Sequence, residues 1–376
     1  MRERTEDLKS FGRVDGALLH GNALKSPVFK TVLGLWLSTN PTNEQKTQCL
    51  ACHVPAVTVF PEHTDRIIEQ VISGSSHVKV EGIGCTSCHL ISAIEDTKDS
   101  YPAFNLSAGR TMFGPYPEAE ENLVHPSKQA DIYEGAHYCT TCHFDKVKDV
   151  AQAHLGDGTL SGLVCQDCHM EQSTGSSTNE RGRLSRPIGR HWFLGVVTPD
   201  IMLSNRNIQA EWSSRVDIEA QKIANSVTGT VHILNGNLTH MFPGGDPTLK
   251  QFFVKLTLKD ETGKVIGHDL KKYGRSYAEL MTGQTPQPLI SGGTTRHIPF
   301  SIPVKEGHSP SFIEASISYA LIPEPGATLK NRFLASLSEE KDRKKAEEII
   351  TEYTSRRLLT FRTKALETSD QQSKES

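Results

Sequence analysis

One short motif occurs four times in this 376-residue chain and uses every cysteine that the chain has. Its form is Cys-x-x-Cys-His, and the copies lie at 49–53, 85–89, 139–143 and 165–169. Eight cysteines are too few for a disulfide scaffold of this length. A zinc knuckle or a redox dithiol also uses C-x-x-C, but neither requires a histidine after every second cysteine.

The repeated motif is the attachment signature of c-type haem. Two thiols about one helical turn apart reach the two vinyl groups of one porphyrin, and the adjacent histidine ligates the iron. We therefore expect four covalent haems. The attachment residues are Cys49, Cys52, Cys85, Cys88, Cys139, Cys142, Cys165 and Cys168, and the proximal iron ligands are His53, His89, His143 and His169.

The second axial ligand of each iron is expected to be histidine, because the chain has 16 histidines and only 6 methionines. His191 and His240 share the pattern H-x-F-x-G, in which the aromatic ring could pack on a porphyrin edge. His20 precedes the first expected helix, and His125 opens the segment before the third motif. These four are the distal candidates. The reserves are His63, His77, His137 and His154, whereas His232, His268, His297 and His308 are interpreted as bystanders.

The hydrophobic pattern predicts an α+β fold made of a loop-rich, mainly helical haem segment and an antiparallel β-sandwich-like domain. Alternation of apolar and polar residues indicates strands in the second half of the chain. The expected helices span 27–39, 61–73 and 127–142, and the expected strands include 252–258, 298–304 and 313–321. A charged helix is expected at 338–359, and a disordered polar tail at 366–376.

Three domains follow from this pattern: a tetrahaem domain at 1–200, a β-sandwich-like domain at 201–330, and a C-terminal helix with its tail at 331–376.

The composition gives no sign of a nucleic-acid-binding protein or of a transmembrane helix. The formal charge is −3, with 41 basic and 44 acidic side chains and no basic block, so nothing indicates nucleic-acid binding. No apolar stretch approaches the length of a transmembrane helix.

Haem c is attached outside the cytoplasmic membrane, so we expect a periplasmic, surface-bound or secreted protein. The first residues, Met1 to Asp7, are charged and lead into no apolar segment. We interpret the chain as a processed or mis-started form without its signal peptide.

Several segments resemble the cytochrome c-554 group of multihaem cytochromes, and the haem motifs are the most specific part of this resemblance. The segments are 48–55, 81–84, 112–116 and 166–170, together with the His191 and His240 loops. The resemblance extends over about residues 15–325. It implies closely packed haems in parallel and perpendicular pairs. The group includes electron shuttles, relatives that oxidise hydroxylamine, and secreted tetrahaem cytochromes that polymerise into conductive filaments.

Three functions compete. The preferred one is electron transfer through four low-spin haems, between redox donor and acceptor proteins or to an extracellular acceptor, with no catalytic residues. The alternatives are an oxidoreductase of small nitrogen or sulfur compounds and a mainly structural surface protein. We also expect a head-to-tail homopolymer, in which His20 or His240 of one protomer ligates iron in the next.

Overall fold

The computed structural model describes residues 20–73, 82–94, 104–107, 109–117, 125–135, 137–142, 165–170, 172–175, 185–189, 191, 215–235, 249–279, 290 and 293–366. They fall into two compact units. The haem-motif unit contains the described residues up to 191 together with 326–349. The β unit contains the described residues of 215–325 together with 350–366. The described residues form helices and mainly antiparallel sheets, which confirms the α+β class.

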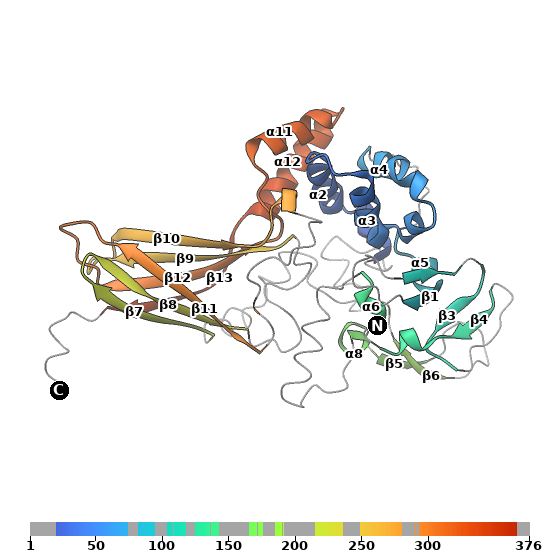
Figure 1. The fold of residues 1–376 in the computed structure, drawn as a ribbon, viewed down its shortest axis with the longest axis horizontal. Coiled ribbons are helices and arrows are strands. Elements are labelled where there is room, and N and C mark those ends of the chain that lie inside the picture. Colours follow the sequence, from blue (N-terminus) through green and yellow to red (C-terminus); the bar gives the residue numbers. More distant parts are fainter. Residues whose placement is uncertain are drawn as a thin grey trace. The chain divides into compact units, whose positions relative to one another are not determined.

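The haem-motif unit begins with helices whose ends are set by capping residues (Figure 1). In α2 (Pro27–Leu37), the Ser26 side chain accepts a hydrogen bond from the Phe29 amide, and proline occupies the first turn. This helix was predicted. In α3 (Asn43–His53), Thr42 and Gln45 form a reciprocal capping box, and sequence analysis missed this helix. The helical elements that complete the first part of the unit are η1 (His20–Lys25), η2 (Pro55–Thr58), η3 (Pro61–His63) and α4 (Thr64–Ile72).

The remaining elements up to residue 191 are short. The helices are α5 (Cys85–His89), η4 (Asp131–Tyr133), α6 (His137–Thr140) and α8 (Cys165–His169). Three two-stranded sheets pair β1 (Ile91–Ile94) with β2 (Phe104–Leu106), β3 (Met112–Gly114) with β4 (Ser127–Gln129), and β5 (Gln172–Gly175) with β6 (Arg186–Gly189). The helix predicted over 127–142 is therefore wrong. Its first residues pair in parallel with β3, the 3-10 helix η4 follows, and α-helix begins only at His137.

Helix α11 (Ala327–Ser336) packs against α2 in the same unit. A Cβ atom added to Gly34 would lie 2.1 Å from Cε2 of Phe333, so only glycine permits this close approach. The Arg332 guanidinium also donates a hydrogen bond of 2.7 Å to the Ser38 carbonyl. Residue 330, where sequence analysis places the second domain boundary, lies inside α11.

The β unit contains two antiparallel sheets. One has the order β10-β9-β12-β13 and the other the order β11-β8-β7. The strands are β7 (Val216–Ile223), β8 (Ser226–Leu234), β9 (Gln251–Lys259), β10 (Val265–Tyr273), β11 (Thr295–Pro303), β12 (Phe312–Ala320) and β13 (Arg357–Ala365). Strands β9, β11 and β12 coincide with predicted strands.

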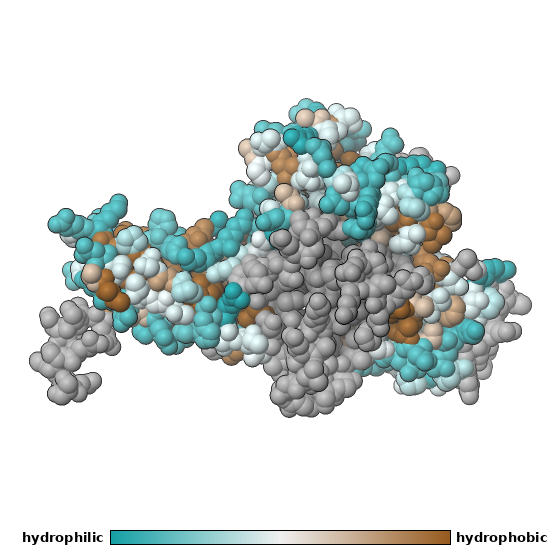
Figure 2. Space-filling view, viewed as in Figure 1, coloured by the Kyte–Doolittle hydropathy of each residue, from teal (hydrophilic) through white to brown (hydrophobic). Residues whose placement is uncertain are grey.

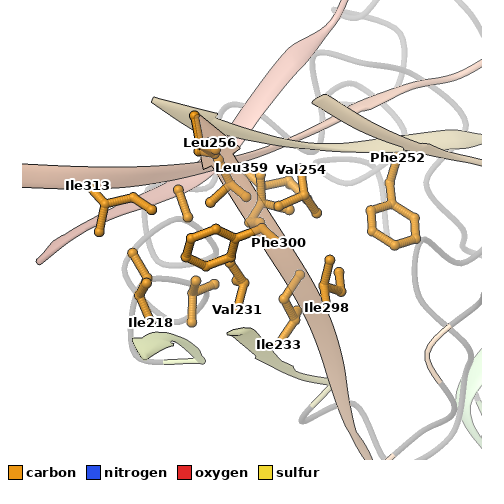
Figure 3. Close-up of a cluster of buried hydrophobic side chains, with 14 of the residues drawn as sticks. Ile218, Val231, Ile233, Phe252, Val254, Leu256, Ile298, Phe300, Ile313 and Leu359 are labelled. Carbon is orange, nitrogen blue, oxygen red and sulfur yellow. The ribbon is translucent and has the colours of Figure 1, made fainter. Parts of the chain in front are cut away.

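Inward-facing side chains of the two sheets form one hydrophobic cluster (Figure 3). Ile218, Val231 and Phe300 come from the three-stranded sheet, and Val254 and Ile313 come from the four-stranded sheet. The alternation of buried and exposed residues along β11 and β12 produces this arrangement. In Figure 2, hydrophilic residues cover most of the visible outer surface of the sheets.

The C-terminal region differs from its prediction. Helix α12 (Glu340–Thr354) ends before residue 359, and Arg357–Ala365 forms β13 instead. Leu366, assigned to the disordered tail, is buried, and its amide donates to the Ser311 carbonyl. Residues 367–376 lie outside the described residues. No helix formed by the described residues is long and apolar enough to span a bilayer.

Candidate haem-binding site

Each C-x-x-C-H motif coincides with a helical turn in the haem-motif unit (Figure 1). The first motif ends α3, the second forms α5, and the fourth forms α8. The third motif begins within α6. Residues three apart lie on the same side of a helix, so α3 and α5 each present both thiols of their motif in one direction. This is the arrangement that attachment of one porphyrin requires.

The second motif has the most completely described surroundings. Nδ1 of His89 lies 2.6 Å from the carbonyl oxygen of Phe113, which is in β3. A carbonyl can only accept, so Nδ1 carries the proton and donates it. The other ring nitrogen, Nε2, is then the one with a free lone pair, and it can ligate a metal. The Phe113 carbonyl thus fixes both the tautomer and the orientation of a proximal ligand.

His191 lies close to His89, although 102 positions separate them in the sequence. Their ring centroids are 6.0 Å apart, with an angle of 52° between the ring planes. A metal–imidazole bond is about 2 Å long and the ring centre lies about 1 Å beyond the nitrogen, so two axial imidazoles on one iron would have centroids about 6 Å apart. The observed separation fits a haem iron between the two rings. Partial burial lowers the pKa of His191, and the nearby His89 lowers it further.

Tyr133 supports the second motif from another side. Its ring is stacked on the His89 ring, with centroids 5.7 Å apart and an angle of 4° between the planes. Its hydroxyl has one proton, which it shares between the carbonyl oxygens of Cys88 and Ile91, each 2.8 Å away. Burial raises the pKa of Tyr133, so the hydroxyl stays protonated and remains a donor. The sequence does not reveal this contact, because Tyr133 lies just before the third motif and more than 40 residues from the second motif, which it supports.

Tyr116 connects the segment that binds His89 with the segment that carries His191. Its hydroxyl donates to the Pro187 carbonyl, and the Arg186 guanidinium lies 3.9 Å from the centre of its ring. Both partners belong to β6, which ends two residues before His191. The stretch from Phe113 to Tyr116 therefore contacts the proximal histidine at one end and the strand before the distal candidate at the other.

Side chains also connect different motifs. The Tyr138 hydroxyl lies near the Cys88 thiol, and burial raises the pKa of both groups. The Gln166 amide, in the fourth motif, donates to the carbonyls of Tyr133 and Gly135. These contacts join the second, third and fourth motifs.

Thiols of different motifs are also within hydrogen-bonding distance of one another. A hydrogen bond to Cys165 raises the pKa of Cys139, and burial adds to the effect. A hydrogen bond from Cys52 lowers the pKa of Cys142. The first motif thus approaches the third, and the third approaches the fourth. Haems attached at these positions would be close neighbours.

The first motif packs against the N-terminal helices. The His53 ring is stacked on Phe29, with centroids 4.0 Å apart. Gly82, shortly before the second motif, allows a close approach here. A Cβ atom at this position would lie 3.2 Å from the Leu24 side chain and 3.4 Å from the His53 carbonyl oxygen.

The other predicted ligands are placed less completely. His20 begins η1 and is partly buried, which lowers its pKa. His125 precedes β4, and its Nδ1 lies 3.2 Å from the Pro126 carbonyl and 3.4 Å from the Ser127 hydroxyl. His143 and His240 lie outside the described residues, as do the reserves His77 and His154. The side chains of Cys168, His169 and His137 are likewise outside the description. These residues stay predictions.

Comparisons with known proteins agree with the character of this site. Residues 29–90, which contain the first two motifs, match the family described as cytochrome c554 and c-prime. This match supports a multihaem c-type cytochrome. No curated protein matches the chain.

Two solved structures show low similarity. A penta-heme cytochrome c552 from Thermochromatium tepidum has a TM-score of 0.46 and 17% identity, over 84% of this chain and 83% of that one. A beta-glucuronidase from glycoside hydrolase family 2 has a TM-score of 0.19 and 9% identity, over 40% of this chain and 11% of that one. Both TM-scores are too low to establish a shared fold.

Proposed function

We propose that this protein transfers electrons through four covalently attached c-type haems. The observation that carries the proposal is the pairing of His89 with His191 at a ring separation of 6.0 Å, beside a motif that can attach the porphyrin. When bound, each haem supplies a one-electron Fe(III)/Fe(II) couple. Two imidazole ligands leave such an iron no open position for a substrate, which favours a carrier over an enzyme.

The residues of the chain have defined tasks in this proposal. Cys85 and Cys88 anchor the porphyrin, and His89 binds its iron with the orientation set by the Phe113 carbonyl. A hydrogen bond from the ring N–H of an imidazole ligand to a carbonyl oxygen raises the basicity of the ligand and so tunes the metal. The contacts among the motifs would keep the haems near one another, and short separations favour electron transfer between them.

The location that suits this function is outside the cytoplasm, because haem c is attached there. The partners would be redox proteins or an extracellular electron acceptor. A head-to-tail polymer with a donated His20 or His240 stays a prediction. Electron microscopy of the native protein tests it. Rods with a regular repeat that are lost in His20→Ala or His240→Ala would support it, and discrete particles at high concentration would contradict it.

The test of electron transfer by bis-histidine haems is low-temperature EPR combined with a redox titration. We expect four low-spin irons, all of which are reduced and reoxidised reversibly. His191→Ala should convert one iron of the four to a high-spin form. His308→Ala, which changes an exposed histidine of the β unit, is the matched control and should leave all four low-spin. Unchanged spectra in His191→Ala would refute the assignment of His191, and a high-spin iron in the wild type would favour an enzyme.

A further inference from the structure

Two histidines that sequence analysis set aside as bystanders lie against each other on the β unit. His232 of β8 and His297 of β11 are directly opposite in the antiparallel register. Their Nδ1 atoms are 2.7 Å apart, and the rings meet edge to face with centroids 4.8 Å apart. Both alternate with buried residues along their strands, so they face away from the hydrophobic cluster.

Glu219 of β7 lies on the other side of the His232 ring. Its Oε1 is 3.4 Å from Nε2 of His232. The geometry of this contact is not that of a hydrogen bond, but the charge of the carboxylate favours a proton on Nε2, which leaves Nδ1 of His232 as the acceptor. His297 must then donate its own Nδ1 proton to form the short contact between the rings. The arrangement is carboxylate, imidazole, imidazole, across three neighbouring strands.

The charge around the pair also suits a cation. Asp217 of β7 is opposite His232 in the register, and both Asp217 and Glu219 are exposed. On the described strands β8 and β11, the same-face neighbours of the pair carry no charge; they are Thr230, Leu234, Thr295 and Pro299.

We propose that His232 and His297 form a binding site for a divalent late transition-metal ion such as Zn²⁺ or Cu²⁺, with Glu219 as the nearby carboxylate whose charge stabilises a proton on Nε2 of His232. Imidazole is a preferred ligand of these ions. Two imidazole nitrogens bound at about 2.0 to 2.1 Å are about 2.9 to 3.4 Å apart for bond angles between square-planar and tetrahedral values. The two Nδ1 atoms therefore need to separate by only a few tenths of an ångström.

Binding needs no net loss of a proton from the neutral pair. His297 exchanges its Nδ1 proton for one on Nε2, and both rings turn so that their Nδ1 lone pairs point at the ion. The carboxylate–histidine–metal arrangement is a common second shell of metal sites. No group of three or more ligating side chains among the described residues is arranged around one point. The site accordingly has two protein ligands, and water completes the coordination.

The test uses the full-length, haem-loaded protein without a histidine tag, after removal of loosely bound metals with EDTA. Equilibrium dialysis against Zn²⁺ is followed by elemental analysis, with the covalent haem iron as the measure of protein concentration. Wild type should bind one more equivalent of Zn²⁺ than His297→Gln. Glu219→Gln should keep the site but bind Zn²⁺ about 10- to 100-fold more weakly.

His308→Ala, which changes an exposed histidine in a turn, is the matched control and should bind as the wild type does. A second measurement distinguishes loss of the Zn²⁺ site from a change in folding. Zn²⁺ should raise the thermal midpoint of the β unit in the wild type and in His308→Ala, because the ion binds only the folded site, but not in His297→Gln. Equal Zn²⁺ binding by wild type and His297→Gln, or an equal rise of the midpoint in both, would overturn the proposal.

Discussion

Replacing Tyr133 by phenylalanine tests how the second haem motif is held in place. The substitution keeps the ring that is stacked on His89, but it removes a hydroxyl that donates to the carbonyls of Cys88 and Ile91. Tyr133 is 8% exposed, so water cannot easily replace the lost donor. The Cys88 carbonyl still accepts from the Leu90 amide, which limits the loss mainly to the bond with Ile91.

The expected cost follows from this geometry. A neutral hydrogen bond contributes about 1 kcal/mol, and a buried acceptor left without a donor costs about 1–3 kcal/mol. Because one of the two acceptors keeps another donor, we expect a loss of about 1–2 kcal/mol, which is about a 5- to 30-fold change in the folding equilibrium. Haem stoichiometry should not change, because the attachment residues remain.

The assay is a denaturant titration followed by haem absorbance, with Tyr277→Phe as the matched control. Tyr277 is also buried, but its hydroxyl has no hydrogen-bond partner among the described residues. Removing that hydroxyl should be neutral or stabilising. If the two variants differ by less than about 0.5 kcal/mol, the reasoning about Tyr133 is wrong.

Three further predictions concern packing, protonation and attachment. Gly34→Ala should destabilise the haem-motif unit by about 1–3 kcal/mol in a denaturant titration, because the new methyl group overlaps the buried Phe333 ring, whereas Gly114→Ala, with nothing within 4 Å of the added atom, should change little. The lowered pKa of His191 favours its neutral form in the folded protein, so the stability it contributes is present above its ordinary pKa of 6.5 and is lost as the pH falls below that value; a denaturation midpoint that rises on acidification would contradict this. Cys168→Ala should remove one thioether and destabilise the fold around the fourth haem, as shown by mass spectrometry and thermal unfolding.

The helix ends and strands that sequence analysis predicted have local causes. The Ser26-Pro27 pair sets the start of α2, and the alternation along β12 sets the buried face of that strand. Where a contact with a distant segment determines the secondary structure, the local sequence pattern predicts the wrong element. Residues 127–129 form a strand because β3 offers a partner. The charged segment after Thr354 forms strand β13 and not a continuation of the helix, because β12 provides a strand with which it pairs.

The residues of the candidate site also differ in whether the sequence alone predicts them. The chemistry of haem attachment requires this spacing of two cysteines and a histidine, so the sequence alone predicts the eight attachment cysteines and the four proximal histidines. Tyr133 and the Phe113 carbonyl could not be found in this way, because they act through contacts between distant segments. His191 was predicted from its H-x-F-x-G pattern, but only the structure relates it to the second motif. The contact between His232 and His297 could be recognised only once the register of their strands was known.

The most direct test of the central claim is the intact mass of the mature protein after acid–acetone extraction, which removes haem that is not covalently bound. The account predicts the mass of the polypeptide plus four haems, with all eight cysteines consumed as thioethers. A mass corresponding to fewer than four haems, or cysteines that still react with a thiol reagent in the unfolded protein, would contradict it.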